Sequence, residues 1–178
     1  ERSWPEDANA QILAGNPDVL KASASFIVHP QLGKWLIALG EHVFGMTSVG
    51  WRVAPLIAGT LLVLVAIRLV RRVSRSTLIG GIAGLLLAFD GLAFVMSRVA
   101  LLDIFLAFFA LAAVACLAAD RDWFRNRLAD HLDRRGLADL GGTFGPGLII
   151  RPWRIAAGVC FGLALASKWN AVYLLAAF

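Results

Sequence analysis

Four long apolar runs, separated by polar or charged segments, dominate the hydrophobic pattern of the chain. They cover residues 51–70, 77–96, 99–119 and 153–178. A helix needs roughly 20 apolar residues to cross the hydrocarbon core of a bilayer, and each run is long enough. The pattern therefore predicts an all-α fold, a polytopic transmembrane helix bundle.

A fifth apolar stretch, residues 33–45, is too short for this role. Trp35, Leu36 and Leu39 follow helical spacing there, but at about 1.5 Å per residue such a helix covers little more than half of the hydrocarbon core. We therefore predict a helix that lies in the membrane interface. The polar segment before it, residues 1–32, predicts an external loop.

The arginines indicate the orientation of these segments. They gather in two connections, one around residues 68–75 and the other in or beside residues 120–152, whereas residues 1–42 hold three basic and five acidic side chains. Cytoplasmic loops of membrane proteins are enriched in Lys and Arg. We therefore predict a multi-pass membrane protein, with 120–152 as a cytoplasmic loop and the 33–45 helix on the extracytoplasmic side.

Composition supports a membrane protein and argues against a nucleic-acid-binding protein. Of the 178 residues, 59% are hydrophobic and 16% are charged, whereas globular domains are about half apolar and about a quarter charged. The net charge of +5 comes from arginines that are not interleaved with stacking aromatic residues. Cys116 and Cys160 lie inside apolar runs and are interpreted as small buried hydrophobes. The spacing of His, Cys and acidic residues suggests neither a metal site nor a cofactor.

Three charged residues interrupt the predicted spans: Asp90, Asp103 and Lys168. Each costs roughly 2.5–3.5 kcal/mol on insertion scales, so a functional role is the default hypothesis. The helical rise places Asp90 about 9 Å and Asp103 about 6 Å below the outer ends of their spans, and Lys168 roughly 22 Å from the cytoplasmic side. With Arg98 in the turn between two spans, all four charges share the outer level of the bilayer.

Two interpretations of this charged level remain open. The charges could form structural ion pairs that fix the register of the helices. Alternatively, they could line a polar cavity in which Lys and Arg bind an anionic phosphate at headgroup depth. His29 and Lys34 lie on the same side of the membrane, and His29 could cap its loop or hydrogen-bond a polar ligand.

Three ordered motifs resemble the bacterial protein O-mannosyltransferase family, which has the GT-C glycosyltransferase fold. They are "HPQLGKWLIALGE", "FDGLAFVMSRVALLDIFLAFF" and "GLALASKWNAVY". The first is similar to the family's His-Pro-Pro-Leu-(Gly/Ala)-Lys motif, with Gln31 in place of the second proline. The second contains Ser97-Arg98 and Asp103, and the third contains the pair Lys168-Trp169.

The resemblance implies a function for the whole protein. The family is expected to transfer mannose from polyprenyl-phosphate-mannose to Ser or Thr hydroxyls of secreted or membrane proteins, on the extracytoplasmic side. Membrane lipids and protein-export machinery are further candidate partners. The substrate-binding residues that we expect, from the charged level and the motifs together, are His29, Lys34, Asp90, Arg98, Asp103, Lys168 and Trp169.

The catalytic residues are not assigned. The family carries an acidic Asp-Glu pair in its first external loop, whereas Glu6-Asp7 has the reverse order and lies too close to the His-Pro motif. The chain starts without methionine and ends inside an apolar run. We therefore expect an internal piece of a longer protein, inactive alone, with the acidic pair located before Glu1.

Three other functions are compatible with parts of the sequence. A related GT-C enzyme could use another polyprenyl-phosphate sugar, or a lipid or glycan acceptor, in the same cavity. A transporter or channel segment could use the charges as an ion path, although charges at one depth fit a headgroup site better. A scaffold or assembly interface is the third alternative.

Overall fold

The computed structural model describes residues 7–16, 28–136, 138 and 151–177, and the regular structure of these parts is α-helical throughout. Parts of the expected 1–32 loop and of the 120–152 connection, with Phe178, lie outside the described residues. The helices are α1 (Ala8–Leu13), α2 (Leu32–Phe44), α3 (Gly50–Ser74), α4 (Thr77–Phe89), α5 (Gly91–Met96), α6 (Leu102–Arg135), α7 (Pro152–Ser167) and α8 (Ala171–Ala176).

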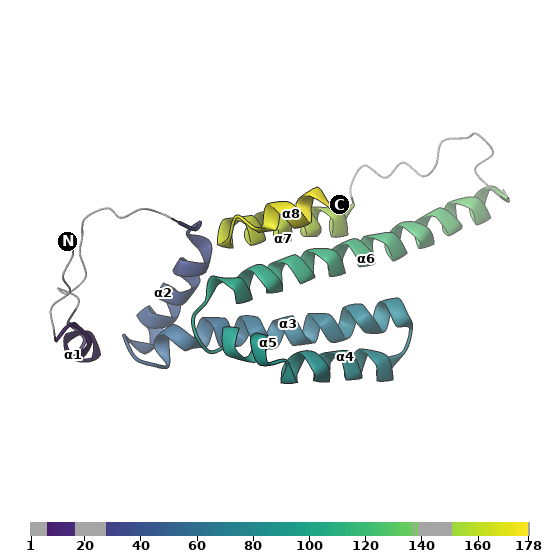
Figure 1. The fold of residues 1–178 in the computed structure, drawn as a ribbon. Coiled ribbons are helices and arrows are strands. Elements are labelled where there is room, and N and C mark those ends of the chain that lie inside the picture. Colours follow the sequence, from purple (N-terminus) through teal and green to yellow (C-terminus); the bar gives the residue numbers. More distant parts are fainter. Residues whose placement is uncertain (1–6, 17–27, 137, 139–150, 178) are drawn as a thin grey trace.

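The two longest helices, α3 and α6, form the centre of the bundle, with α4 packed on α3 and α7 packed on α6 (Figure 1). Of the helices that the structure describes, only these two are long and apolar enough to cross a membrane alone. The helices α4 and α7 are apolar but shorter, with 13 and 16 residues. Their shortness follows from breaks at charged residues.

Both breaks fall on residues of the predicted charged level. The run 77–96 is divided at Asp90, whose extended backbone (φ −65°, ψ 123°) ends α4 and begins α5. The run 153–178 is divided at Lys168 (φ −156°, ψ 137°), after which α8 lies beside α7 rather than beyond its end (Figure 1). The sequence predicts one unbroken helix in each case, and the structure shows two.

Helix α6 shows the opposite difference from the sequence prediction. The apolar run 99–119 enters the helix only at Leu102, and the helix then continues through the charged segment to Arg135. Gly136, with φ 62°, ends it in a left-handed conformation, where the sequence predicts the end of a charged helix. At about 1.5 Å per residue, the 34 residues span about 51 Å, well beyond a hydrocarbon core of about 30 Å.

Glycines allow α3 and α4 to pack closely, as the glycine-rich sequence of α4 predicts. Gly80 and Gly84 are buried, and a Cβ atom at Gly84 would overlap the side chain of Ile67. Gly81 instead faces open space. Two of the three glycines thus lie at the helix contact.

Helix α2 covers one end of the bundle, close to the predicted range of 33–45 (Figure 1). Its Leu36 and Ile37 pack against the core formed by Ala58, Leu62, Ile104 and Phe105. We call this the α2 end; it also contains the start of α6 and the end of α7. The opposite end, with the end of α3, the charged half of α6 and the start of α7, is called the arginine end.

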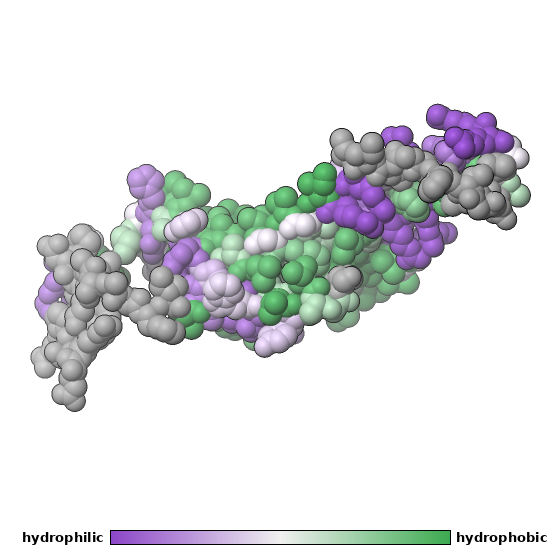
Figure 2. Space-filling model, turned by 90° about the horizontal axis from the view of Figure 1, so that it is seen from above, coloured by the Kyte–Doolittle hydropathy of each residue, from purple (hydrophilic) through white to green (hydrophobic). Residues whose placement is uncertain are grey.

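The surface between the two ends is apolar. Figure 2 shows hydrophobic residues across the middle of the molecule and hydrophilic residues gathered toward the arginine end. Large exposed hydrophobic side chains occur on α3, α4 and α7 in this middle region, among them Leu61, Leu86 and Ile155. An exposed apolar surface of this extent is typical of a protein that lies in lipid. The fold is an all-α membrane helix bundle.

Candidate functional site

An ion pair between α6 and α7 forms the centre of the charged cluster at the α2 end. Lys168 Nζ lies 2.6 Å from Asp103 Oδ1, and the two side chains are 17% and 33% exposed. Asp103 belongs to the first turn of α6, whereas Lys168 follows the last turn of α7. Helix dipoles stabilise an anion at the first position and a cation at the second. Local structure therefore favours both charges where the structure places them.

The amino end of α2 reaches the same region. Lys34 Nζ donates a hydrogen bond of 3.3 Å to the carbonyl oxygen of His29. A Cβ atom on buried Gly33 would come within 2.6 Å of Leu102 Cδ2, so this turn of α2 packs directly against the start of α6. Helix α2 also contacts α7. The elements that carry four of the expected site residues therefore meet at one end of the bundle.

His29 contributes a polar atom without a partner. Its Nδ1 atom is buried, and no hydrogen-bond partner for it exists among the described residues. A buried polar atom that lacks a hydrogen bond is destabilising, and in native proteins such atoms are uncommon. The unpartnered Nδ1 atom is consistent with the expectation that His29 binds a polar ligand. This atom makes no hydrogen bond that would cap the loop.

Asp90 and Arg98 make their contacts outside this ion pair. Asp90 Oδ2 accepts a hydrogen bond of 2.8 Å from the backbone N–H of Ala93, so it caps α5. The Arg98 guanidinium lies 4.0 Å from the ring centroid of Phe94, on the preceding turn. Both residues are exposed, and Trp169 is 63% exposed. Of the predicted charged level, the structure joins Asp103 and Lys168 directly.

The turn that leads into Asp103 has an unusual backbone. Ala100 has φ 26°, a positive value that is unfavourable for a residue with a Cβ atom. The turn is held by Ser97, whose Oγ donates to the carbonyl oxygen of Phe94 at 2.8 Å and whose Cβ faces Gly59 of α3. Strain of this kind, about 1–3 kcal/mol, persists where the surrounding structure enforces it.

An apolar groove of about 430 Å³ runs from the α2 end along the bundle. Its walls are hydrophobic side chains of α2, α3 and α6, including Leu39, Val43, Ile57, Leu61, Phe105 and Phe109. Phe105 is two residues after Asp103, so the groove reaches the first turns of α6, on a different face of that helix from Asp103. An apolar surface and the charged cluster thus occur at the same end of the bundle.

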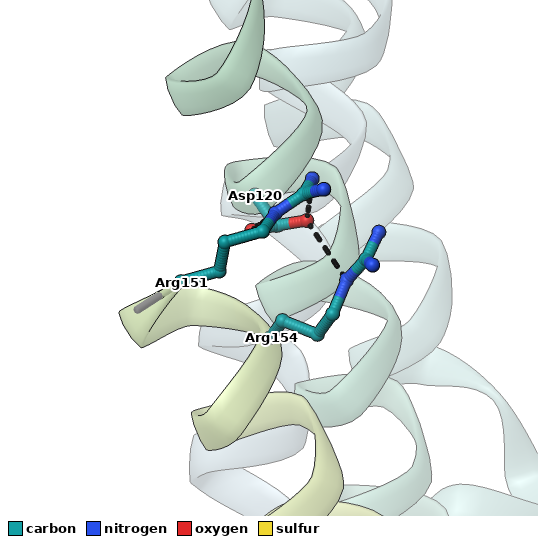
Figure 3. Close-up of polar contacts among 3 residues, drawn as sticks. All are labelled: Asp120, Arg151 and Arg154. Carbon is teal, nitrogen blue, oxygen red and sulfur yellow. Dashed lines mark hydrogen bonds and ion pairs between the residues drawn. The ribbon is translucent and has the colours of Figure 1, made fainter. Parts of the chain in front are cut away.

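A second charged cluster, which the sequence patterns did not predict, lies at the arginine end (Figure 3). Arg151 donates two hydrogen bonds to Asp120, from Nε to Oδ1 at 3.1 Å and from Nη2 to Oδ2 at 2.5 Å. Arg154 Nε lies 3.5 Å from the same Oδ2 atom. Asp120 is only 3% exposed. The sequence signal was present, because Asp120 directly follows an apolar run and the two arginines flank the start of another.

The remaining reactive side chains do not form a further cluster of this kind. Cys116 and Cys160 are free, half-buried thiols, and they lie within hydrogen-bonding reach of each other across α6 and α7. In the part of the chain that the structure describes, no three His, Cys, Asp or Glu side chains are placed to hold a metal ion.

These features define a class: a membrane protein built as a helix bundle, with a charged cluster and an apolar groove at the same end. Residues 16–127 match the profile of the family described as dolichyl-phosphate-mannose-protein mannosyltransferase. The chain belongs to this family, whose fold is of the GT-C type. The predicted family is thereby confirmed.

Curated relatives agree with the family assignment. The chain is 50% identical over 153 residues to the polyprenol-phosphate-mannose–protein mannosyltransferase of Mycolicibacterium smegmatis (strain MKD8). The proteins of the same name from Mycobacterium tuberculosis (strain ATCC 25618 / H37Rv) and Corynebacterium glutamicum (strain ATCC 13032) are 47% and 45% identical over 152 residues. Each alignment covers 85% of this chain and 29% of the relative. No solved structure matches the chain.

Proposed function

We propose that this chain is part of an enzyme that transfers mannose from polyprenyl-phosphate-mannose to Ser or Thr hydroxyls of proteins. The transfer takes place at the extracytoplasmic face of the cell membrane, at the α2 end of the bundle. The observation that carries the proposal is the Asp103–Lys168 ion pair at the same end of the bundle as an apolar groove. The names of the relatives, which specify a polyprenol-phosphate-mannose donor and a protein acceptor, support the same chemistry.

The chemistry requires cations where the phosphate lies. The acceptor hydroxyl attacks C1 of mannose, the bond between C1 and the phosphate oxygen breaks, and polyprenyl phosphate leaves with the electron pair of that bond. A cation near this oxygen stabilises the negative charge that develops on it. Lys168 has three N–H donors and uses one of them toward Asp103, so it can bind phosphate and carboxylate together.

The other site residues have distinct proposed roles. Asp103 holds Lys168 in place, and Lys34 and Arg98 provide further positive charge at the same end of the bundle. His29 offers its unpartnered imidazole nitrogen to a hydroxyl or phosphate oxygen. Asp90 and Trp169 face the exposed side of the same end. The acidic group that removes the proton of the acceptor hydroxyl is proposed to belong to the part of the protein outside this chain.

The proposed function implies an arrangement in the membrane. Residues 51–70, 77–96 and 99–119 and helix α7 cross the bilayer, α2 lies along its outer interface, and the arginine end faces the cytoplasm. The breaks at Asp90 and Lys168 then lie inside the outer half of the bilayer. Interrupted membrane helices are tolerated where the exposed backbone lines a protein cavity. The groove of about 430 Å³ takes the first isoprene units of the donor.

The test is mannosyl transfer by the full-length protein to a peptide acceptor. We expect Lys168→Ala and Arg98→Ala to abolish transfer, because each removes a cation from the phosphate site. Arg52→Ala is the matched control: Arg52 is an exposed cation near the α2 end that stacks on Trp51, its neighbour in the sequence. Normal transfer by both site variants would overturn these assignments.

The acceptor is tested by the same preparation. Mass spectrometry of the products should identify mannosylated peptide. A glycolipid or glycan product would instead indicate a related GT-C transferase with a different acceptor. A protein that moves ions across sealed vesicles, without transfer of sugar, would favour the transporter hypothesis.

A further inference from the structure

Helix α7 is bound to α6 at both of its ends by an ion pair. Arg151 immediately precedes α7 and pairs with Asp120, and Lys168 immediately follows it and pairs with Asp103. The separations are equal: 17 residues on α6 (120 − 103) and 17 residues on α7 (168 − 151). On two antiparallel helices, equal separations mean that both pairs belong to one register, about 25 Å apart at 1.5 Å per residue.

The contact surface between these two pairs consists largely of small residues. Ala113 of α6 and Ala157 and Ala164 of α7 are each at most 1% exposed, and Phe161, at 6%, is the large side chain buried on α7 here. Small residues let helices approach closely, but they provide little interlocking that would resist sliding along the helix axis. Directional polar contacts at the two ends of α7 therefore supplement the packing of Phe161 in fixing the register.

The pair at the arginine end is the stronger of the two. The Asp120 side chain is 4% exposed and Arg151 donates to both of its oxygens. The Arg151 guanidinium also stacks 4.7 Å above the Phe124 ring. Arginine next to the start of a helix is disfavoured by the helix dipole, so the Asp120 carboxylate offsets an electrostatic cost at this position. Bidentate pairs of this kind have a defined geometry.

We propose that Asp120 is a positioning residue, which fixes the register of α7 on α6 and thereby brings Lys168 to Asp103. This role rests on the proposed function, because it gives Asp120 an effect on a phosphate site about 25 Å away. Asp120 does not touch the substrate. Its effect reaches the site through the rigid helix α7.

The chain contains its own reporter of this register. Cys116 on α6 and Cys160 on α7 lie within hydrogen-bonding reach of each other, between the two ion pairs. A displacement of α7 by one turn, about 5.4 Å, would separate these thiols. Dibromobimane, which becomes fluorescent when it links two nearby thiols, can therefore measure the register without any enzymatic assay.

The experiment uses the full-length protein in membranes, with any cysteine other than Cys116 and Cys160 replaced by serine. Asp120→Asn should lower the yield of the linked product several-fold. It should also lower mannosyl transfer by about 10- to 100-fold, the scale of a misplaced reacting group. The ratio of its changes in KM and kcat should match that of Asp103→Asn, and the double variant should be no worse than Asp103→Asn alone.

Two further variants separate positioning from a general loss of structure. Asp120→Glu keeps the charge and should retain most of the linking and the transfer, and Asp130→Asn is the control for an exposed carboxylate on the same helix. Arg151→Lys keeps the charge but loses the bidentate geometry, and it should fall between Asp120→Asn and the unchanged protein. If Asp120→Asn does not fold, the thiol linking and transfer of Arg151→Lys provide the test instead.

Each outcome decides the proposal. Unchanged thiol linking in folded Asp120→Asn would overturn the register role. Lowered linking with unchanged transfer would overturn the connection between this register and the site. If the unchanged protein transfers no mannose, the proposed function fails, whereas the linking yields still decide whether Asp120 fixes the register.

Discussion

Each of the two ion pairs between α6 and α7 joins an aspartate to a basic residue, but the two pairs differ in burial and in geometry. At the arginine end, Asp120 accepts two hydrogen bonds from Arg151, contacts Arg154, and is almost completely buried. At the α2 end, Asp103 and Lys168 share one close contact and keep 33% and 17% of their side chains exposed. The first pair is closed to a ligand, and the second is open to one.

The difference follows from the donors that each pair leaves unused. The planar fork of Arg151 matches a carboxylate and holds it in a defined geometry. Lysine is a point charge with three donors, so a partner such as Asp103 leaves part of its binding capacity available. A buried, bidentate pair suits a fixed structural contact, whereas a lysine with unused donors, beside a partly exposed carboxylate, suits an anion that must bind and leave.

The largest expected effect concerns the closed pair. Asp120→Ala should lower the free energy of unfolding of the full-length protein by about 3–5 kcal/mol, because it leaves a largely buried arginine without its partner. Asp103→Ala should lower it less, because the unpaired Lys168, although only 17% exposed, can extend its flexible side chain toward the headgroup region. Thermal unfolding in the same detergent measures both. Equal losses for the two variants would contradict the distinction between a closed and an open pair.

The next largest effect should appear at the open pair, in activity. Asp103→Asn should lower mannosyl transfer by about 10- to 100-fold, since loss of a positioning or electrostatic contact in a site has costs of this order. Its unfolding temperature should change little. Transfer at the normal rate would show that Lys168 needs no carboxylate to stay in place, and the pair would then be structural.

Sequence patterns could predict the α2 end because depth in a helix bundle follows from counting residues. The helical rise placed Asp103 and Lys168 at one level, and they form a pair in the structure. Asp90 and Arg98 have the same depth but turn to partners on α5, namely Ala93 and Phe94. Depth is fixed by position along the chain, whereas direction depends on local caps and turns.

The arginine end shows why other features were not predictable. Asp120 resembles the first residue of a charged loop, and its burial depends on Arg151, 31 residues later in the chain. The break at Lys168 is equally hidden, because hydropathy continues through it and only the backbone shows the extended conformation. Such features are decided by packing between segments that lie far apart in the sequence.

Disrupting the contact between α2 and α6 would test whether the Asp103–Lys168 pair depends on the packing of α2 at this end of the bundle. Gly33→Val should destabilise this contact by about 1–3 kcal/mol, the usual range for overpacking, since even a Cβ atom would crowd Leu102 at 2.6 Å. We expect a lower rate of mannosyl transfer, with accelerated proteolysis near α2. Gly81→Val is the control, because Gly81 has no atom within 4 Å of an added Cβ. Equal effects of both would exclude a specific role for the α2 contact.

The smallest expected effect separates burial from charge as the cause of the difference. Asp122 lies two residues after Asp120 on the same helix and contacts Arg72 at 3.4 Å, with side-chain exposures of 49% and 43%. Asp122→Asn should change the free energy of unfolding by at most about 0.5 kcal/mol, because exposed pairs are screened by water and salt. Thermal unfolding of Asp122→Asn beside Asp120→Asn makes the comparison with charge and helix held constant. If Asp122→Asn loses as much free energy of unfolding as Asp120→Asn, the number of carboxylates near the arginine end matters more than their burial. Burial would then not explain the contribution of the closed pair to stability.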